Sequence, residues 1–299
     1  MRIAHRPEYR LPLPPRHRFP MAKYELLPEQ LLYEGTAEPA DFFAPEPMPL
    51  PELFLTHDEA YYRRLRDGAL TAKEVRALGF PLSRNLLERE LILAQATLDC
   101  ARFSRADGVA LNTAGGTHHS FRDRGEGFCV FNDIAAAANV LLERGEAARI
   151  LVFDLDVHQG NGTAALLRDE PRVTTVSVHG ARNYPLRKEA SDVDVGLPDG
   201  TSDEAYLTAV APLIEAHVRR ARPDLVFYLA GVDVLADDKL GRLGLSKAGC
   251  RERDRLVLQA CADAGVPVVV CMGGGYAERL ATIIDAHANT YRVARAIFG

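Results

Sequence analysis

Short apolar runs that alternate with helix-length segments constrain the fold of this chain most strongly. The runs are rich in Val, Ile and Leu, a composition typical of parallel strands that are buried on both faces. They cover residues 109–111, 148–153, 173–178, 225–230 and 266–271. Because open parallel sheets bind ligands beyond the carboxyl ends of their strands, we expect a site where these runs end.

Helical segments separate the predicted strands and also precede them. We predict helices over 21–32, 56–66, 88–105, 133–144, 202–222, 246–265 and 277–297. Thr201 and Glu204 have the spacing of a capping box for the fifth helix, and Gly265 is placed to end the sixth. The first 55 residues are rich in Pro and should drape over the body. The pattern predicts one α/β domain over residues 1–299, with three layers (α/β/α) and a mainly parallel central sheet.

Composition excludes several classes of protein. The 299 residues are 47% hydrophobic and 26% charged, as in an ordinary globular protein, and no apolar run is long enough to span a bilayer. A net charge of -5 argues against binding to nucleic acid, which needs clustered Lys and Arg. Five cysteines without Cys-x-x-Cys spacing predict neither disulfides nor a thiolate zinc site. We expect no membrane partner, no nucleic-acid partner and a cytoplasmic location.

Two carboxylates and an imidazole follow predicted strands. Asp156 and His158 are two positions apart in the same segment and can face one side, and Asp233 follows the strand at 225–230. Such a set can hold a metal ion, and it leaves one coordination position open for water or a substrate carbonyl. An open position is typical of catalytic metal sites. Zinc is favoured for a hydrolase, and iron(II) would also fit these ligands. Asp154, on the same face as Asp156, is expected to orient a histidine.

The stretch Gly115–His119 supplies two adjacent imidazoles at the end of the strand at 109–111. Hydrolysis of an amide needs a base for the attacking water, an acid for the leaving amine and a donor for the developing oxyanion. His118 and His119 can meet the first two needs, and Tyr276, after three glycines, can meet the third. In isolation, a pair of histidines is more often a solvated loop, and Tyr276 could equally be a core residue.

Several motifs occurring together resemble one known family. Gly115–His119, Gly127–Cys129, Asp154–Gly162, Gly231–Asp233 and Gly273–Tyr276, in this order, are similar to the zinc-dependent histone deacetylase family, and within it to the bacterial and class IV branch. The similarity runs from about residue 5 to the C-terminus. It implies the arginase/deacetylase fold and hydrolysis of an N-acyl amine by a metal-activated water.

The resemblance also implies a role for each matching residue. His119 would be the general base with His118 as its partner, and Tyr276 would polarise the acyl carbonyl. The implied zinc ligands are Asp156, His158 and Asp233. Gly127 and Phe128 would line a channel for an alkyl-amine chain, with Tyr184 as the opposite wall and Leu240 at the gate. A structural potassium ion would be held by Asp154, Asp156, His158, Ser177 and Val178, mostly through backbone carbonyls.

Two departures from the family pattern stand out. Asn161 takes the place behind His119 where many members of the family have Asp. The class IV branch resembles this chain in having Asn there. Because an amide stabilises an imidazolium less than a carboxylate does, His119 should be less basic. Between Thr71 and Asn85 there is no Asp to match the one that grips the peptide backbone in eukaryotic relatives, which weakens the case for protein substrates.

The leading hypothesis is a metal-dependent deacetylase acting on acyl-lysine or a similar small N-acetylated amine. The closest alternative is an acetylpolyamine amidohydrolase, which the apolar Leu240 disfavours because polyamine enzymes can carry an acidic gate. A ureohydrolase with paired manganese lacks the extra Asp and His that it needs around Asp154–Asn161. A silent module that binds acylated side chains is disfavoured by the complete set of catalytic residue types.

Overall fold

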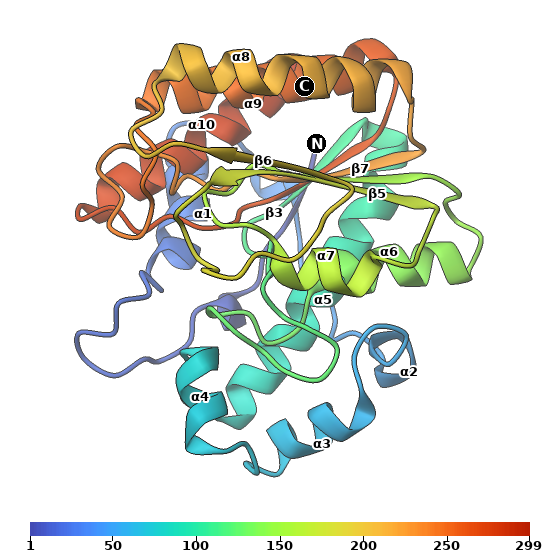
Figure 1. Cartoon of the computed structure of the whole chain (residues 1–299), viewed down its shortest axis with the longest axis vertical. Coiled ribbons are helices and arrows are strands. Elements are labelled where there is room, and N and C mark those ends of the chain that lie inside the picture. Colours follow the sequence, from blue (N-terminus) through green and yellow to red (C-terminus); the bar gives the residue numbers. More distant parts are fainter.

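One sheet of eight strands, all parallel to their neighbours, forms the centre of the computed structural model, which describes residues 1–299 (Figure 1). The strands lie in the order β2-β1-β3-β8-β7-β4-β5-β6. They are β1 (Arg2–Ala4), β2 (Phe42–Phe43), β3 (Val109–Asn112), β4 (Ile150–Asp154), β5 (Val173–Gly180), β6 (Val193–Leu197), β7 (Leu225–Leu229) and β8 (Val268–Cys271). The α/β class and the five predicted strands are confirmed.

Three further strands were not predicted. β1 and β2 contain only three and two residues, too few to show a periodic pattern, and they lie in the Pro-rich first part of the chain. β6 forms the other edge of the sheet, and its residues alternate between partial burial and exposure. An edge strand of this kind lacks the continuous apolar run that marks the central strands.

Helices cover both faces of the sheet, which gives the three layers predicted (Figure 1). Helices α8, α9 and α10 lie on one face, and α5, α6 and α7 lie on the other. The small helices α2, α3 and α4 extend beyond α5. The helices are α1 (Lys23–Tyr33), α2 (Leu50–Leu53), α3 (Glu59–Arg66), α4 (Ala72–Leu78), α5 (Arg84–Asp107), α6 (Asp133–Glu143), α7 (Asn161–Leu167), α8 (Asp203–Ile214), α9 (Lys247–Ala264) and α10 (Leu280–Phe298).

Helix boundaries differ from the predictions at several points. The predicted capping box is wrong, because the hydroxyl of Ser202 accepts the hydrogen bond from Ala205 N, while Thr201 donates to Pro198 O at 2.7 Å. The helix predicted over 202–222 changes to a π-helix at Glu215–Arg220. The short helices α2, α4 and α7 were not predicted. Gly265 does end α9, with a φ of 66°.

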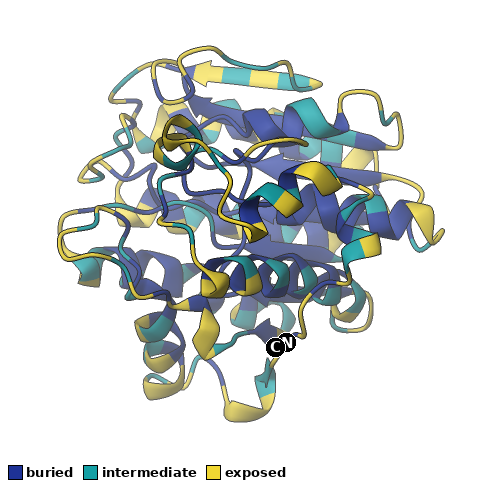
Figure 2. Cartoon of the chain, turned by 90° about the horizontal axis from the view of Figure 1, so that it is seen from below, coloured by how far each residue is buried: buried dark blue, intermediate teal, exposed yellow.

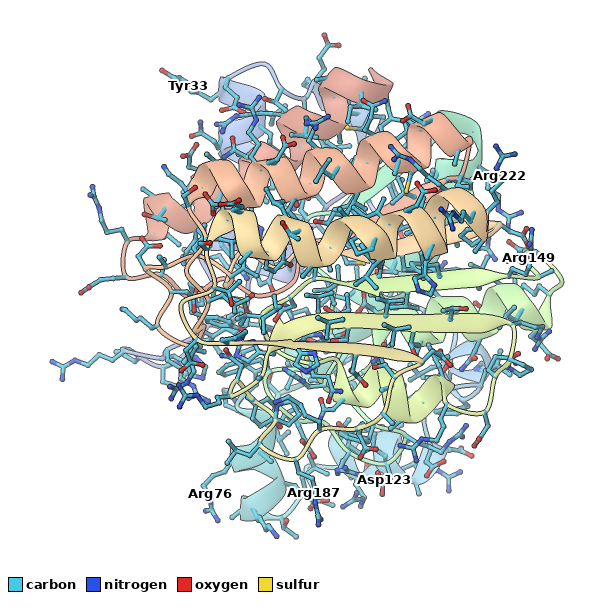
Figure 3. All side chains as sticks on the ribbon, turned by 45° about the horizontal axis from the view of Figure 1, so that its top comes forward. Tyr33, Arg76, Asp123, Arg149, Arg187 and Arg222 are labelled. Atoms are coloured by element: carbon cyan, nitrogen blue, oxygen red, sulfur yellow. The ribbon has the colours of Figure 1, made fainter.

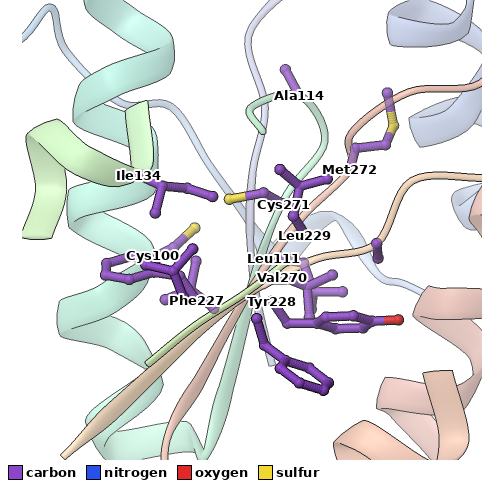
Figure 4. Close-up of a cluster of buried hydrophobic side chains, with 14 of the residues drawn as sticks. Cys100, Leu111, Ala114, Ile134, Phe227, Tyr228, Leu229, Val270, Cys271 and Met272 are labelled. Atoms are coloured by element: carbon purple, nitrogen blue, oxygen red, sulfur yellow. The ribbon is translucent and has the colours of Figure 1, made fainter. Parts of the chain in front are cut away.

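Apolar side chains fill the space between the layers. Figure 4 shows that Phe227 and Tyr228, neighbours in β7, project to opposite sides of the sheet. The burial colours in Figure 2 place the dark, buried elements at the centre and exposed residues in the peripheral loops. All five cysteines are buried and unpaired, which agrees with the prediction of no disulfide framework. None of the helices combines the length and the apolar character that crossing a membrane requires.

Candidate active site at the carboxyl ends of the strands

The loops that follow the carboxyl ends of the central strands meet around a narrow cavity of about 40 Å³. Strand β4 lies between β5 and β7, and β8 lies between β7 and β3, so these loops are brought side by side. The predicted residues that line the cavity are His118, His119, Gly127, Phe128, Asp156, His158, Asp233 and Tyr276. The structure therefore brings together segments that are more than 150 residues apart in the sequence.

Asp156, His158 and Asp233 form a compact set of possible metal ligands. One ligand atom from each residue lies within 4.8 Å of the others, and all three residues are buried. Nδ1 of His158 is 3.1 Å from Oδ1 of Asp156 and 3.1 Å from Oδ2 of Asp233. A cluster of two carboxylates and one imidazole at this spacing suits a divalent metal such as zinc.

Backbone amides hold the two carboxylates. Gly274 N donates to Oδ2 of Asp156 at 2.7 Å, and Val157 N donates to Oδ1 of Asp233 at 3.1 Å. Gly274 has no room for a side chain, because a Cβ atom there would overlap Oδ2 of Asp233. The glycine stretch before Tyr276 thus lets the backbone approach the ligand cluster closely.

Two buried carboxylates so close together repel each other. Burial and the charge of Asp156 together raise the pKa of Asp233 to about 7. Burial alone would lower the pKa of His158, but its hydrogen bonds to Asp156 and Asp233 raise it to about 10. The cluster therefore attracts positive charge, which in these residues is carried by the imidazole and could equally be carried by a metal ion.

The two adjacent histidines have different partners behind them. Nδ1 of His118 lies 2.8 Å from Oδ2 of Asp154, and Nδ1 of His119 lies 2.7 Å from Oδ1 of Asn161. Burial lowers the pKa of His118, but the charges of Asp154 and Asp156 outweigh it and raise the pKa. Burial and the neighbouring His118 and His158 lower the pKa of His119 well below its usual value. The surroundings thus favour the protonated form of His118 and the neutral form of His119.

Gly127 and Phe128 form a wall beside His119. Both residues have positive φ angles, 55° and 69°. A Cβ atom on Gly127 would lie 2.7 Å from Cδ2 of His119, so only glycine fits this close approach. The ring of Phe128 packs against Phe19 and Tyr276, with ring centroids 5.1 and 6.1 Å apart.

Tyr276 lies at the border of the cavity, where it is held through its backbone. Its amide donates to Oδ2 of Asp238 at 2.6 Å. Nζ of the buried Lys23 lies 5.7 Å from the centre of the Tyr276 ring and donates to Gly273 O at 3.2 Å. Burial raises the pKa of the Tyr276 phenol well above its usual value, so it stays protonated and can donate a hydrogen bond.

Six predicted residues lie outside the cavity lining, and two of them, Asp154 and Asn161, stand behind the histidines as described above. Tyr184 packs its ring edge-on against His119, with centroids 4.8 Å apart, and is 40% exposed at the surface. Leu240 lines a neighbouring cavity that shares Tyr276. Ser177 and Val178 are buried in β5, and Ser177 pairs with Asp154 of β4 across the sheet. The potassium site stays a prediction.

Sequence reasoning missed three residues that line the cavity: Phe19, Tyr24 and Arg89. Phe19 and Tyr24 come from the Pro-rich first segment, and Arg89 comes from α5. Arg89 is buried and donates to Tyr9 O at 2.8 Å. A buried arginine in an amphipathic helix looks like a surface residue in sequence, so no local pattern could have found it.

Comparisons with known proteins agree with this geometry. The family described as "Histone deacetylase domain" matches residues 17–291. An uncharacterized protein of Picosynechococcus sp. is 42% identical over 99% of both chains. Histone deacetylase 2 of Arabidopsis thaliana is 30% identical over 92% of this chain and 74% of its own.

A solved structure supports the fold independently. The crystal structure of an HDAC homologue complexed with SAHA superimposes with a TM-score of 0.81 and covers 99% of this chain and 82% of that chain. Its sequence is only 23% identical, so it testifies to the fold alone. Since the family match spans most of the chain and the Arabidopsis relative covers most of it as well, the chain belongs to the histone deacetylase family of deacetylase hydrolases.

Proposed function

We propose that residues 1–299 act as one catalytic domain, a zinc-dependent deacetylase that removes acetyl groups from acyl-lysine or a similar N-acylated amine. One observation carries this proposal. The ligand cluster of Asp156, His158 and Asp233 lines the same cavity as the two histidines and Tyr276. Amide hydrolysis needs a set of metal ligands, a proton acceptor and a hydroxyl donor around one cavity.

A zinc ion fits the donor set. The ligand atoms are close enough to share one ion, and all three ligand residues are buried. When bound, zinc would act as a Lewis acid toward the acyl carbonyl and lower the pKa of water. Iron(II) would satisfy the same ligands.

The protein's own residues would handle the protons. His119 is neutral and accepts a proton through Nε2, because its Nδ1 faces the oxygen of Asn161. The pKa of His118 is raised beside Asp154, which favours its protonated form, and His118 would support the developing negative charge or protonate the leaving amine. The hydroxyl of Tyr276 would donate to the oxyanion. Gly127 and Phe128 would confine the alkyl chain of the amine.

Acetylpolyamine hydrolysis is the runner-up. A polyamine brings a second ammonium group, which needs a carboxylate near the mouth of the cavity. The side chain at the expected gate is Leu240, and Lys239 precedes it. This arrangement favours acyl-lysine.

The test compares the turnover of an acetyl-lysine peptide, acetylspermidine and arginine by the zinc-loaded protein, with metal content measured by elemental analysis. The proposal expects one metal ion per chain and a higher kcat/KM for the peptide. A strong preference for acetylspermidine would overturn the substrate assignment. Two manganese ions per chain with arginine turnover would replace the deacetylase with a ureohydrolase.

A further inference from the structure

A second cavity opens beside the catalytic one. It has a volume of about 510 Å³, and both cavities are lined by Tyr276. Its floor is apolar, formed by residues such as Met21, Leu240 and Ile283. A substrate that extends out of the catalytic cavity past Tyr276 would meet this second cavity.

The charges around this second cavity are unbalanced. Arg16, Arg18 and Lys239 line it, whereas Glu278 supplies its only carboxylate. The three cationic side chains are exposed and take part in none of the ion pairs or hydrogen bonds of the structure. This local excess of positive charge lies on a chain whose net charge is -5, so it is a local feature and not a property of the whole surface.

Contact with the catalytic wall shows how near these cations are to the site. The guanidinium of Arg18 lies 4.9 Å from the centre of the Phe128 ring, and Phe128 lines the catalytic cavity. Lys239 directly precedes Leu240 in the loop that follows Asp233. The cations thus come from two separate segments that border the same mouth.

Glu126, which directly precedes Gly127 of the catalytic wall, is a carboxylate that is already engaged. Oε2 of Glu126 accepts from the Tyr184 hydroxyl at 2.7 Å, and Oε1 accepts from Arg124 at 2.8 Å. Glu126 therefore offers little uncompensated negative charge to a cationic substrate. Within the lining of the second cavity, three unpaired cations stand against the single carboxylate of Glu278.

We propose that this basic cavity is a specificity site for a carboxylate carried by the substrate close to its acylated amine. The inference rests on the deacetylase function proposed above and narrows its substrate class to acylated amines with an acidic neighbouring group. Unpaired cations can attract such a carboxylate without first breaking an internal ion pair, and they repel the additional ammonium groups of a polyamine.

Three short acetyl-lysine peptides that differ only in one adjacent residue, Glu, Gln or Lys, test the proposal. We expect kcat/KM to fall in that order, by on the order of tenfold from the Glu to the Lys peptide, because several exposed pairs each contribute modestly. The difference should shrink at 0.5 M NaCl, since salt screens exposed charges. Equal rates for all three peptides would overturn the specificity site and leave the deacetylase function standing. Turnover of none of them would overturn the deacetylase function itself.

Variants assign the preference to the cavity. In the Arg16→Gln, Lys239→Gln double variant the Glu to Lys ratio should fall to about one, while Arg18 is kept because it packs on Phe128. Arg222→Gln is the matched control, since Arg222 lies just before β7, at the opposite end of the strands from the site (Figure 3). A ratio that persists in the double variant, or that falls equally in Arg222→Gln, would contradict the proposal. Thermal melting of each variant checks that it is folded.

Discussion

Nδ1 of His119 lies 2.7 Å from Oδ1 of Asn161, an amide where a carboxylate could stand. Burial and the charges of His118 and His158 lower the pKa of His119 well below its usual value, and the hydrogen bond with the Asn161 amide offsets only part of this. A general base must be neutral to act, so activity should be lost only when the pH falls through this low pKa.

Asn161→Asp should therefore move the acidic limb of the kcat/KM profile to higher pH, by about one unit, because the new carboxylate stabilises the imidazolium. The measurement is kcat/KM from pH 4 to 9. Asn85→Asp, the same change at an exposed position, is the control and should leave the profile in place. An unchanged acidic limb in Asn161→Asp would show that His119 is not the base.

Tyr276→Phe should lower kcat by roughly two to three orders of magnitude, the usual loss for one oxyanion donor. The ring still packs against Phe19 and Phe128, so zinc content and thermal stability should stay at the level of the unmodified protein. Steady-state kinetics and elemental analysis of the same sample measure both effects. Full activity in this variant would remove the phenol from the mechanism.

Arg253 is a buried cation that fastens the strand ends of the site to α9. It donates to Leu155 O at 3.1 Å and to Gly231 O at 2.7 Å, and it pairs with Asp254 at 2.8 Å. Arg253→Met would leave Asp254 buried without its partner, so the free energy of unfolding should fall by about 3–5 kcal/mol. Urea denaturation measures this loss.

Arg222→Met replaces an exposed arginine and is the control, which should change the free energy of unfolding by less than about 0.5 kcal/mol. Equal stabilities of Arg253→Met and the unmodified protein would mean that the buried network contributes nothing. Tyr228 and Thr290 also donate to Asp254, so part of its charge stays hydrogen-bonded in the variant.

His57 should make the fold sensitive to acid. It is fully buried, its Nε2 accepts from Asn132 N at 2.9 Å, and burial lowers its pKa to about 4. The unfolded chain binds this proton near pH 6.5, so stability is complete above that value and is lost progressively as the pH falls toward 4. The loss amounts to up to about 3 kcal/mol.

Urea denaturation at pH 7, 5.5 and 4.5 measures this dependence in the unmodified protein and in His57→Gln. The variant is less stable at pH 7, but its stability should fall less steeply toward acid. Parallel curves for the two proteins would place the acid sensitivity elsewhere.

Much of the fold and the ligand cluster could be predicted because each depends on a local pattern. The strand β4 and the segment Asp156–His158 are adjacent in sequence, and parallel pairing then brings Asp233, after β7, to the same edge. The residue behind His119 was predictable only through the family resemblance, since 42 positions separate His119 and Asn161.

What could not be predicted depends on contacts between distant segments. Lys23 and Arg89 are buried near the site, although charged side chains in helices usually face solvent. The wrong cap at Thr201 has a local cause, because the neighbouring Ser202 can accept the same kind of hydrogen bond and lies one position closer to the helix. Sequence spacing alone does not decide between two such hydroxyls.

The most direct test of the account is a crystal structure of the zinc-loaded protein with diffraction data collected at the zinc absorption edge. We predict a single anomalous peak in contact with Asp156, His158 and Asp233, within reach of His118, His119 and Tyr276. Two adjacent peaks, or one ion held by Asp156 and His158 with Asp233 turned away, would contradict it.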